Sequence, residues 1–529
     1  PSVWYLADIG GASVSAIGGT LVGTPAVLVG HNGRVGWGLT TANVDDQDIF
    51  IERLNPDDPG QYLTPEGWRA FETRRIRVEV AGGDEVVETV RESRHGPVLA
   101  PDQFSVGSIT PEGHVAALAW TALADDDSSL SALVALMRAD SADAAIEAAG
   151  MAVAPAQMVT LADRNGVAMV VAGAIPVRDA RSQTQGRMPS PGWRPVNDWQ
   201  GMRAPLLNPR VIRPPEGAVA NANNRITDAP FPGHIGFDWA PPYRIERIEK
   251  ELAARRFHSR DSFVALQADT ISEMARSVLP LVARDLWWRE GEEGAEGLRG
   301  EALRLLADWT GEMDQHGPEP LIFMEWMRQL TRGLAADELG GLFPLVAGPH
   351  PLFVERVFRD IDGAARWCDI DKTPERERCS AIASAALDDA LARLARDHGA
   401  ELAGWRWGEA HLAVHRHTPL GHGSPLGLLV NVEQETPGGD HTLMRGMTPG
   451  SGPHPFRNVH AAGLRVVLDF ADLDRSLMIM APGQSGHPFS RWYDHLAERW
   501  ARGDMIQMSR SEEDVRSGAV GEMRLIPAE

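Results

Sequence analysis

Short apolar runs alternate with polar residues over most of the first 173 positions, a texture that predicts β-strands. An Asn-Gly pair at 32–33 separates an apolar run at 26–29 from an alternating run at 34–39, and a second pair at 165–166 separates 158–161 from 168–171. Asn and Gly accept the positive φ angles of two-residue turns, so both segments predict β-hairpins. Further strands are expected at 75–80, 85–90 and 115–120, and one helix at 129–149.

Helical periodicity takes over after Asn223. Ile245, Ile248 and Leu252 share one helical face, and the same spacing predicts further helices at 259–269, 273–290, 299–312, 320–337 and 379–398. β texture then returns over 403–482, with strands expected at 428–432, 464–470 and 476–480 and a closing helix at 489–502. Strands followed by helices and again by strands predict an α+β protein.

The same change of texture predicts three parts. Residues 1–243 form the first part of a β-rich core, 244–400 form a mainly helical insertion or outer layer, and 401–529 return to the core sheet and end in the C-terminal helix. Within the first part, 174–217 is rich in Pro, Gly, Arg and Ser and is expected to be a long surface excursion.

The charge balance limits the partners. The 51 basic and 73 acidic residues give a net charge of −22, which argues against a nucleic acid or an anionic membrane. No apolar run approaches the roughly 18 residues that cross a bilayer, so no membrane span is expected. The two cysteines, Cys368 and Cys379, enclose a polar loop that a disulfide could close in an oxidising compartment; two unrelated thiols are the alternative.

Several longer motifs share one resemblance. They are GHNGRVGWGLTTANVDDQDIF at 30–50, VANANNRITD at 219–228, WAPPYRIERI at 239–248, GGDHTLMRG at 438–446 and APGQSGHPFSRWYDH at 481–495. In their order and spacing the chain resembles the β chain of the penicillin acylase family of N-terminal-nucleophile hydrolases. The resemblance implies a four-layer αββα sandwich of antiparallel sheets with a helical insertion. It further implies an N-acyl amide hydrolase, an α chain from the same precursor, a periplasmic or secreted setting and a Cys368–Cys379 disulfide.

The first residues depart from the family pattern. Family members begin their β chain with Ser, less often Cys or Thr, whose own α-amino group acts as the base. This sequence begins with Pro1, and residues 1–5 look like family sequence that lies after the nucleophile. We therefore expect an N-terminally incomplete β chain, without its nucleophile, propeptide and α chain.

The resemblance assigns catalytic roles to three residues. Asn223 corresponds to the family's oxyanion-hole asparagine, since a neutral amide can donate hydrogen bonds to a developing negative oxygen. Asn221 takes that role if the alignment is shifted by two residues. Thr41 falls where the family supplies a second donor, its main-chain N–H, and Arg244 matches an arginine near the active site, in a supporting electrostatic role or in a structural salt bridge.

The resemblance also implies a calcium site. Asp45, the carbonyl of Gln47, and Asp48 match the family's ligands on this chain, and Gly186 is a candidate carbonyl ligand. The aspartate that completes the site in well-known members is replaced near Gly233-His234. A solvated acidic loop is the alternative, and no organic cofactor is expected.

Three residues correspond to the acyl pocket of the family: Val29, Leu39 and Gln157. Val29 and Leu39 are aliphatic where members specific for aromatic acyl groups carry bulkier or polar side chains, which favours an aliphatic or unusual acyl group. Core packing would equally explain both. The implied substrates are small acyl amides: β-lactams with an amide side chain, N-acyl homoserine lactones or acylated peptides.

Three other functions compete with this one. The segment Gly483–His487 begins like a nucleophile elbow, but His487 replaces its second glycine, so we reject that interpretation. His411 and His415 are four residues apart and could bind zinc from one helix face in a metal-dependent hydrolase, although they could equally belong to a strand. A non-catalytic binding or structural subunit, or an inactive fragment, is the alternative from another class.

Overall fold

The structure is a computed structural model that describes residues 2–11, 13–227, 233–287, 297–371, 373–423 and 425–526. It divides into two compact units. The β-rich unit comprises Asp8–Ile17 and Pro25–Ala240, and the helix-rich unit comprises Pro1–Ala7, Gly18–Thr24 and Pro241–Glu529. The division into 1–243, 244–400 and 401–529 remains a prediction that these units do not test.

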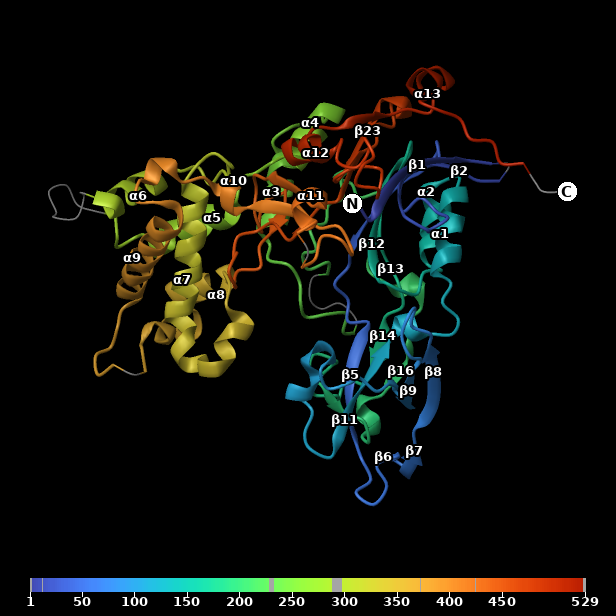
Figure 1. The fold of residues 1–529 in the computed structure, drawn as a ribbon, viewed down its shortest axis with the longest axis horizontal. Coiled ribbons are helices and arrows are strands. Elements are labelled where there is room, and N and C mark those ends of the chain that lie inside the picture. Colours follow the sequence, from blue (N-terminus) through green and yellow to red (C-terminus); the bar gives the residue numbers. More distant parts are fainter. Residues whose placement is uncertain are drawn as a thin grey trace. The chain divides into compact units, whose positions relative to one another are not determined.

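Most of a seven-stranded sheet lies in the β-rich unit, while parts of its first two strands, β1 and β2, belong to the helix-rich unit. The strand order is β1-β2-β3-β4-β12-β13-β17, with bounds Trp4–Gly10, Ser15–Leu21, Val29–His31, Gly36–Thr41, Gln157–Asp163, Gly166–Ala172 and Arg210–Ile212. One face packs on two helices, α1 (Ser129–Arg138) and α2 (Ala142–Ala149) (Figure 1). Trp37, Val159 and Leu161 from the strands meet Leu136 and Ala145 from the helices in this core.

Both predicted hairpins form, but each turn lies one residue from the expected place. In the first, the N–H of Asn32 donates to the carbonyl of Val35 at 3.1 Å, so Gly33 and Arg34 form the turn and only Gly33 needs a positive φ, 88°. In the second, Asp163 pairs with Gly166. The Asn side chain therefore stands before the first turn instead of inside it, where its Oδ1 accepts the N–H groups of Arg34 and Val35.

The prediction of a single helix at 129–149 is wrong, because the structure has two helices in this range. α1 ends at Arg138, and Ser141 begins α2 by accepting the N–H of Ala144 with its hydroxyl. A serine in this position stabilises a new helix start, which is a local signal that periodicity alone does not reveal.

The other strands of the β-rich unit form smaller sheets. β5 (Gln47–Arg53) lies between β11 (His114–Trp120) and β15 (Ser190–Pro191), and β14 (Pro176–Arg178) pairs with β16 (Trp199–Met202). The excursion expected at 174–217 therefore contains short strands. The remaining elements are β6 Gln61–Thr64 with β7 Gly67–Ala70, and β8 Glu72–Val78, β9 Val86–Ser93 and β10 Gly96–Pro97.

The helix-rich unit is built around α7 (Glu319–Leu339), whose side chains are buried on several faces. α9 (Cys379–His398) runs beside it, and the indole N–H of Trp326 donates to the carbonyl of Ala383 at 2.9 Å (Figure 1). The other helices are α3 Tyr243–Ala253, α4 Arg260–Gln267, α5 Glu273–Val282, α6 Gly297–Asp308, α8 Pro351–Phe358, α10 Trp407–Ala410, α11 Gly427–Val430, α12 Ala497–Arg502 and α13 Glu512–Gly518. The helices predicted in this region form, but the one expected at 273–290 ends at Val282, and 283–287 are not helical. Residues 288–296 lie outside the described residues.

Two predictions near the C-terminal end are wrong. The segment 428–432 contains the short helix α11 instead of a strand, and Leu428 and Leu429 are exposed. The closing helix covers only α12, because Leu496 is its N-cap and Trp500 anchors its buried face. The strands here are β18 Leu412–His415, β19 Val432–Glu435, β20 Gly446–Met447, β21 His460–Ala461, β22 Leu464–Val467, β23 Ser476–Met480 and β24 Ile506–Met508.

Cys368 and Cys379 are joined by a disulfide, which confirms the pairing that the resemblance implied. Of the helices in the described ranges, none is long and apolar enough to cross a membrane.

Candidate active site

Asn223 lies in a tight loop between Asn221 and Asn224. Its φ is 61°, a left-handed conformation that Asn tolerates better than most residues. The loop is held by its own side chains: Oδ1 of Asn221 accepts the N–H of Asn223 at 2.9 Å, and Oδ1 of Asn224 accepts the N–H of Ala222 at 3.0 Å. These bonds fix the backbone from which the Asn223 side chain projects.

The Asn223 side chain reaches the end of β4. Its Nδ2 donates to the Thr40 hydroxyl at 3.0 Å and to the main-chain oxygen of Thr41 at 3.1 Å. The two residues that the resemblance assigns to oxyanion stabilisation are therefore adjacent. The observed contact uses the Thr41 carbonyl, and the oxyanion role of both residues stays a prediction.

A second asparagine, which the sequence did not single out, holds the same loop. Nδ2 of Asn43 donates to the carbonyl oxygen of Asn223 at 3.1 Å, and the N–H of Ala240 donates to that oxygen at 2.9 Å. Asn43 also has a left-handed backbone, with φ 51°. The sequence did not identify Thr40 and Asn43, because they acquire a role only through contact with the 221–224 loop. The position of Asn43 in a turn-like segment is the one local feature that could have indicated an unusual backbone there.

The three expected acyl-pocket residues lie on β3, β4 and β12. Val29 begins β3, Leu39 pairs with Val159, and Gln157 pairs with Thr41. Alternate residues of a strand share a face, so Leu39, Thr41 and Gln157 point to the same side of the sheet. Leu39 packs at the edge of the core formed with α1 and α2. Their role in acyl binding stays a prediction.

The acidic segment 45–48 includes the first two residues of β5, and protein side chains bind its Asp45 and Asp48 carboxylates. Both carboxylate oxygens of Asp48 bind the guanidinium of Arg178, and Oδ2 also accepts the indole N–H of Trp199. The carboxylate of Asp45 is 2.5 Å from Nε2 of His234. Gly186 lies directly against Asp48.

Calcium requires six to eight oxygen ligands at about 2.3–2.6 Å. Gln47 begins β5, and the carboxylates of Asp45 and Asp48 face a histidine and an arginine respectively. Within the described ranges, no three His, Cys, Asp or Glu side chains are grouped so that they could hold a metal ion. This donor set does not fit calcium.

Arg244 belongs to the helix-rich unit, on α3, where it is buried. Burial, and then the neighbouring charge of Arg445, lower its pKa to about 10. The same two arginines and burial act on His441, whose pKa is lowered to about 3, with burial the larger cause. His441 is therefore a neutral imidazole at physiological pH.

His411 and His415 are not arranged as the zinc site considered as an alternative would require. His411 follows α10 and its ring nitrogens face the carbonyls of Thr436 and Gly446, at 2.9 and 3.1 Å, whereas His415 lies on β18. The two rings therefore do not share a helix face. Burial lowers the pKa of both, to about 4 for His415.

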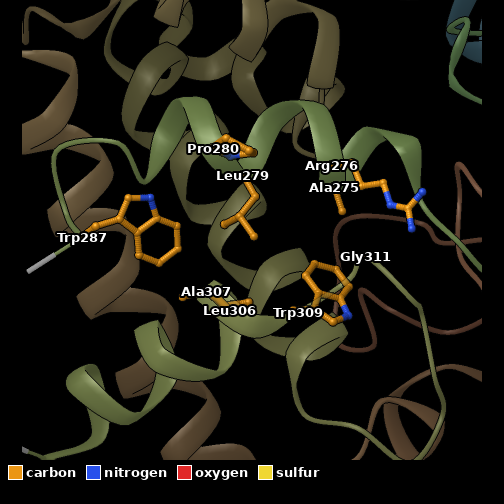
Figure 2. A pocket seen from close by; sticks show the side chains of 9 residues that line it. All are labelled: Ala275, Arg276, Leu279, Pro280, Trp287, Leu306, Ala307, Trp309 and Gly311. Carbon is orange, nitrogen blue, oxygen red and sulfur yellow. The ribbon is translucent and has the colours of Figure 1, made fainter.

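A cavity of about 470 Å³ lies in the helix-rich unit, between α5 and α6 (Figure 2). Figure 2 shows Trp287, Trp309 and Leu279 around it. Among the described residues that line it, Arg276 is the only charged one, and it is bound to Glu273 and to the carbonyl of Thr310. These described lining residues include no nucleophile and no acid or base, so they give no reason to place amide hydrolysis here.

The chain has a mixed α+β fold. A thermostable penicillin G acylase from Alcaligenes faecalis has a similar structure, with a TM-score of 0.76 over 100% of this chain and 95% of that chain, at 20% sequence identity. The penicillin amidase family model matches residues 1–517. The chain therefore belongs to the penicillin amidase family.

Curated relatives carry two kinds of name. The acyl-homoserine lactone acylase QuiP of Pseudomonas syringae pv. tomato is 27% identical over an alignment of 552 positions, which covers 99% of this chain and 64% of the relative. The penicillin acylase 2 proenzyme of Pseudomonas sp. (strain SE83) is 30% identical over an alignment of 528 positions, which covers 97% of this chain and 63% of the relative. The chain thus spans less than two thirds of the length of these proteins.

Proposed function

We propose that this chain is the catalytic β chain of an N-acyl amide hydrolase. The proposal rests on the contact between Nδ2 of Asn223 and the main chain of Thr41, 3.1 Å, in a member of the penicillin amidase family. An uncharged amide beside the end of a strand suits a site that must stabilise a transient negative oxygen, because its donors are fixed before the reaction begins.

The reaction would proceed through an acyl-enzyme. The N-terminal residue of the mature chain attacks the amide carbonyl carbon with its side-chain oxygen or sulfur, and its own α-amino group takes the proton. The carbonyl oxygen becomes negative and accepts hydrogen bonds from Asn223 and from the N–H of Thr41. The C–N bond then breaks, the amine leaves with the proton, and water releases the carboxylic acid.

In the free protein, Asn223 Nδ2 donates to two acceptors, the Thr40 hydroxyl and the Thr41 carbonyl. A substrate oxygen would replace one of them. The Thr40 hydroxyl can rotate and find another partner, whereas a strand carbonyl cannot, so we assign the exchange to Thr40.

The names of the relatives suggest two substrate classes, N-acyl homoserine lactones and penicillins. Aliphatic Val29 and Leu39 at the positions assigned to the acyl pocket favour an aliphatic acyl chain. Val29, Leu39 and Gln157 would line this pocket, and Arg244 would act from α3 through its positive charge.

The remaining expectations are part of the same proposal. The α+β fold would be completed to a four-layer αββα sandwich by an α chain from the same precursor. The protein would act in the periplasm or outside the cell, where the Cys368–Cys379 disulfide is stable.

The test is a panel of acyl amides assayed for release of the free amine, with the protein expressed from its complete gene. The panel contains linear acyl homoserine lactones of several lengths and penicillins with aromatic or aliphatic side chains. We expect amine release from at least one class, with aliphatic acyl groups preferred. During turnover, mass spectrometry of the intact chain should detect an increase in mass equal to the acyl group. If none of the compounds releases its amine, the proposal is contradicted.

A further inference from the structure

Arg178 and Asp48 form an ion pair inside the β-rich unit. Nε of Arg178 donates to Oδ2 of Asp48 at 3.0 Å and Nη2 donates to Oδ1 at 2.7 Å, so the contact is bidentate. The side chains are only 2% and 5% exposed, respectively. The indole N–H of Trp199 donates to Oδ2 at 2.7 Å. Asp48 is thus neutralised by one cation and satisfied by three donors.

The sheet places these donors together. Arg178 ends β14, and the register pairs it with Trp199 on β16. Because directly paired residues of an antiparallel ladder are neighbours, one ladder position delivers both the guanidinium and the indole to the same carboxylate. The contact is therefore built into the fold of this unit.

The guanidinium also joins two positions of the acidic segment. Nη2 of Arg178 donates to the main-chain oxygen of Asp45 at 2.8 Å as well as to Asp48. A carboxylate and a carbonyl three residues apart are the kind of oxygens that a bound cation would bring together. In this chain the guanidinium of Arg178 brings these two oxygens together.

The other predicted ligands are also arranged around this pair. Nε2 of His234 lies 2.5 Å from the carboxylate of Asp45. A Cβ on Gly186 would lie 2.4 Å from Oδ1 of Asp48 and 2.7 Å from Nε of Arg178, so the backbone of the 182–188 loop passes against the ion pair. Only a residue without a side chain fits there.

Arg178 and a metal ion would compete for the carboxylate of Asp48. A divalent cation at the Asp48 carboxylate would lie within a few ångströms of the guanidinium, and repulsion between them is strong in a buried site. Removing Asp48 from Arg178 would also leave a buried arginine without its counter-ion, which is costly.

We infer that Arg178 takes the place of a structural metal ion in this chain: its guanidinium holds the 45–48 segment together beside Gly186, and the fold needs no calcium. The inference does not depend on catalysis, because it concerns only how the chain is held at the start of β5.

The first experiment is made on the full-length protein. Its metal content is measured by mass spectrometry after gel filtration, and its melting temperature is compared in excess EDTA and in millimolar calcium chloride. We expect no stoichiometric calcium and the same melting temperature in both solutions. A stoichiometric calcium ion, or a melting temperature that falls in EDTA, would overturn the inference.

The second experiment compares two arginines of the same region. Arg178→Ala should lower the melting temperature by at least about 5 °C, because it leaves Asp48 buried and uncompensated. Arg181→Ala is the matched control, since Arg181 pairs with Asp179 at an 82% exposed site and surface pairs contribute little. Equal melting temperatures for the two variants would overturn the inference. Should Arg178→Ala fail to fold, Arg178→Lys is compared with Arg181→Lys by the same criterion.

Discussion

Asn43 donates a hydrogen bond from Nδ2 to the main-chain oxygen of Asn223, 3.1 Å away and 180 residues further along the chain. Both residues have left-handed backbones, with φ of 51° and 61°. The bond therefore joins two unusual conformations and fixes the loop that carries the proposed oxyanion donor. A rigid donor is what electrostatic catalysis requires, since a donor that must reorganise loses much of its effect.

Asn43→Gly should lower kcat about fivefold to tenfold with little change in KM, because it removes a hydrogen bond worth roughly 1 kcal/mol that positions Asn223. Glycine tolerates the positive φ, so the backbone at position 43 keeps its conformation. Steady-state kinetics on the best substrate of the panel provides the measurement. An unchanged kcat would show that Ala240 alone suffices to hold the Asn223 carbonyl.

Gly186→Ala should destabilise the protein by about 2–4 kcal/mol, because strain at φ 83° adds to a clash with Asp48 and Arg178. Gly33→Ala separates the two causes. Gly33 has φ 88°, but a Cβ there meets nothing within 4 Å, so only the backbone strain of about 1–2 kcal/mol remains. Urea unfolding measures both variants, and equal losses would show that close packing at Gly186 has no cost.

His441 should make the protein sensitive to acid. Burial, Arg244 and Arg445 lower its pKa to about 3, whereas an unfolded histidine has a pKa near 6.5. Its contribution to stability is present above about pH 6.5 and is lost as the pH falls toward 3, because only the unfolded chain binds the proton in that range. When the pH is lowered from about 7 to about 5, this single group should reduce the free energy of unfolding by about 2 kcal/mol.

The comparison is His441→Gln, whose amide does not titrate. Urea unfolding at both pH values should show a smaller loss for the variant than for the unsubstituted protein, by about 2 kcal/mol. Parallel losses would mean that His441 takes up a proton in the folded state as readily as in the unfolded state.

Local signals predicted the secondary structure well wherever they were sufficient. The strands of both hairpins and the helices α3 to α7 and α9 follow from alternation, helical spacing and end signals such as Gly399, whereas α8 (Pro351–Phe358) was not predicted. The prediction failed where a single residue outweighed the pattern: Ser141 starts a second helix, and the apolar segment 428–432 leaves Leu428 and Leu429 exposed. The apolar character of 428–432 indicated a buried strand. No local feature of the sequence shows which apolar segments are packed in the core and which remain exposed.

The candidate site was predicted less completely. Sequence motifs identified Asn223 and Thr41, which the fold brings together although they are 182 residues apart. Thr40, Asn43 and Arg178 were not identified, because each acts through a partner distant in sequence. The acidic segment 45–48 led to the prediction of calcium, and nothing local in the sequence indicated that Arg178 would pair with Asp48.

The central claim is that Asn223 stabilises the oxyanion, and the rate of acylation in a single turnover tests it most directly. Asn223→Ala should slow acylation about 10²- to 10³-fold, whereas Asn165→Ala, the same substitution in the exposed turn between β12 and β13, should leave it unchanged. Unfolding midpoints would establish that both variants are folded. An acylation rate for Asn223→Ala within a factor of a few of the unsubstituted protein would contradict the account.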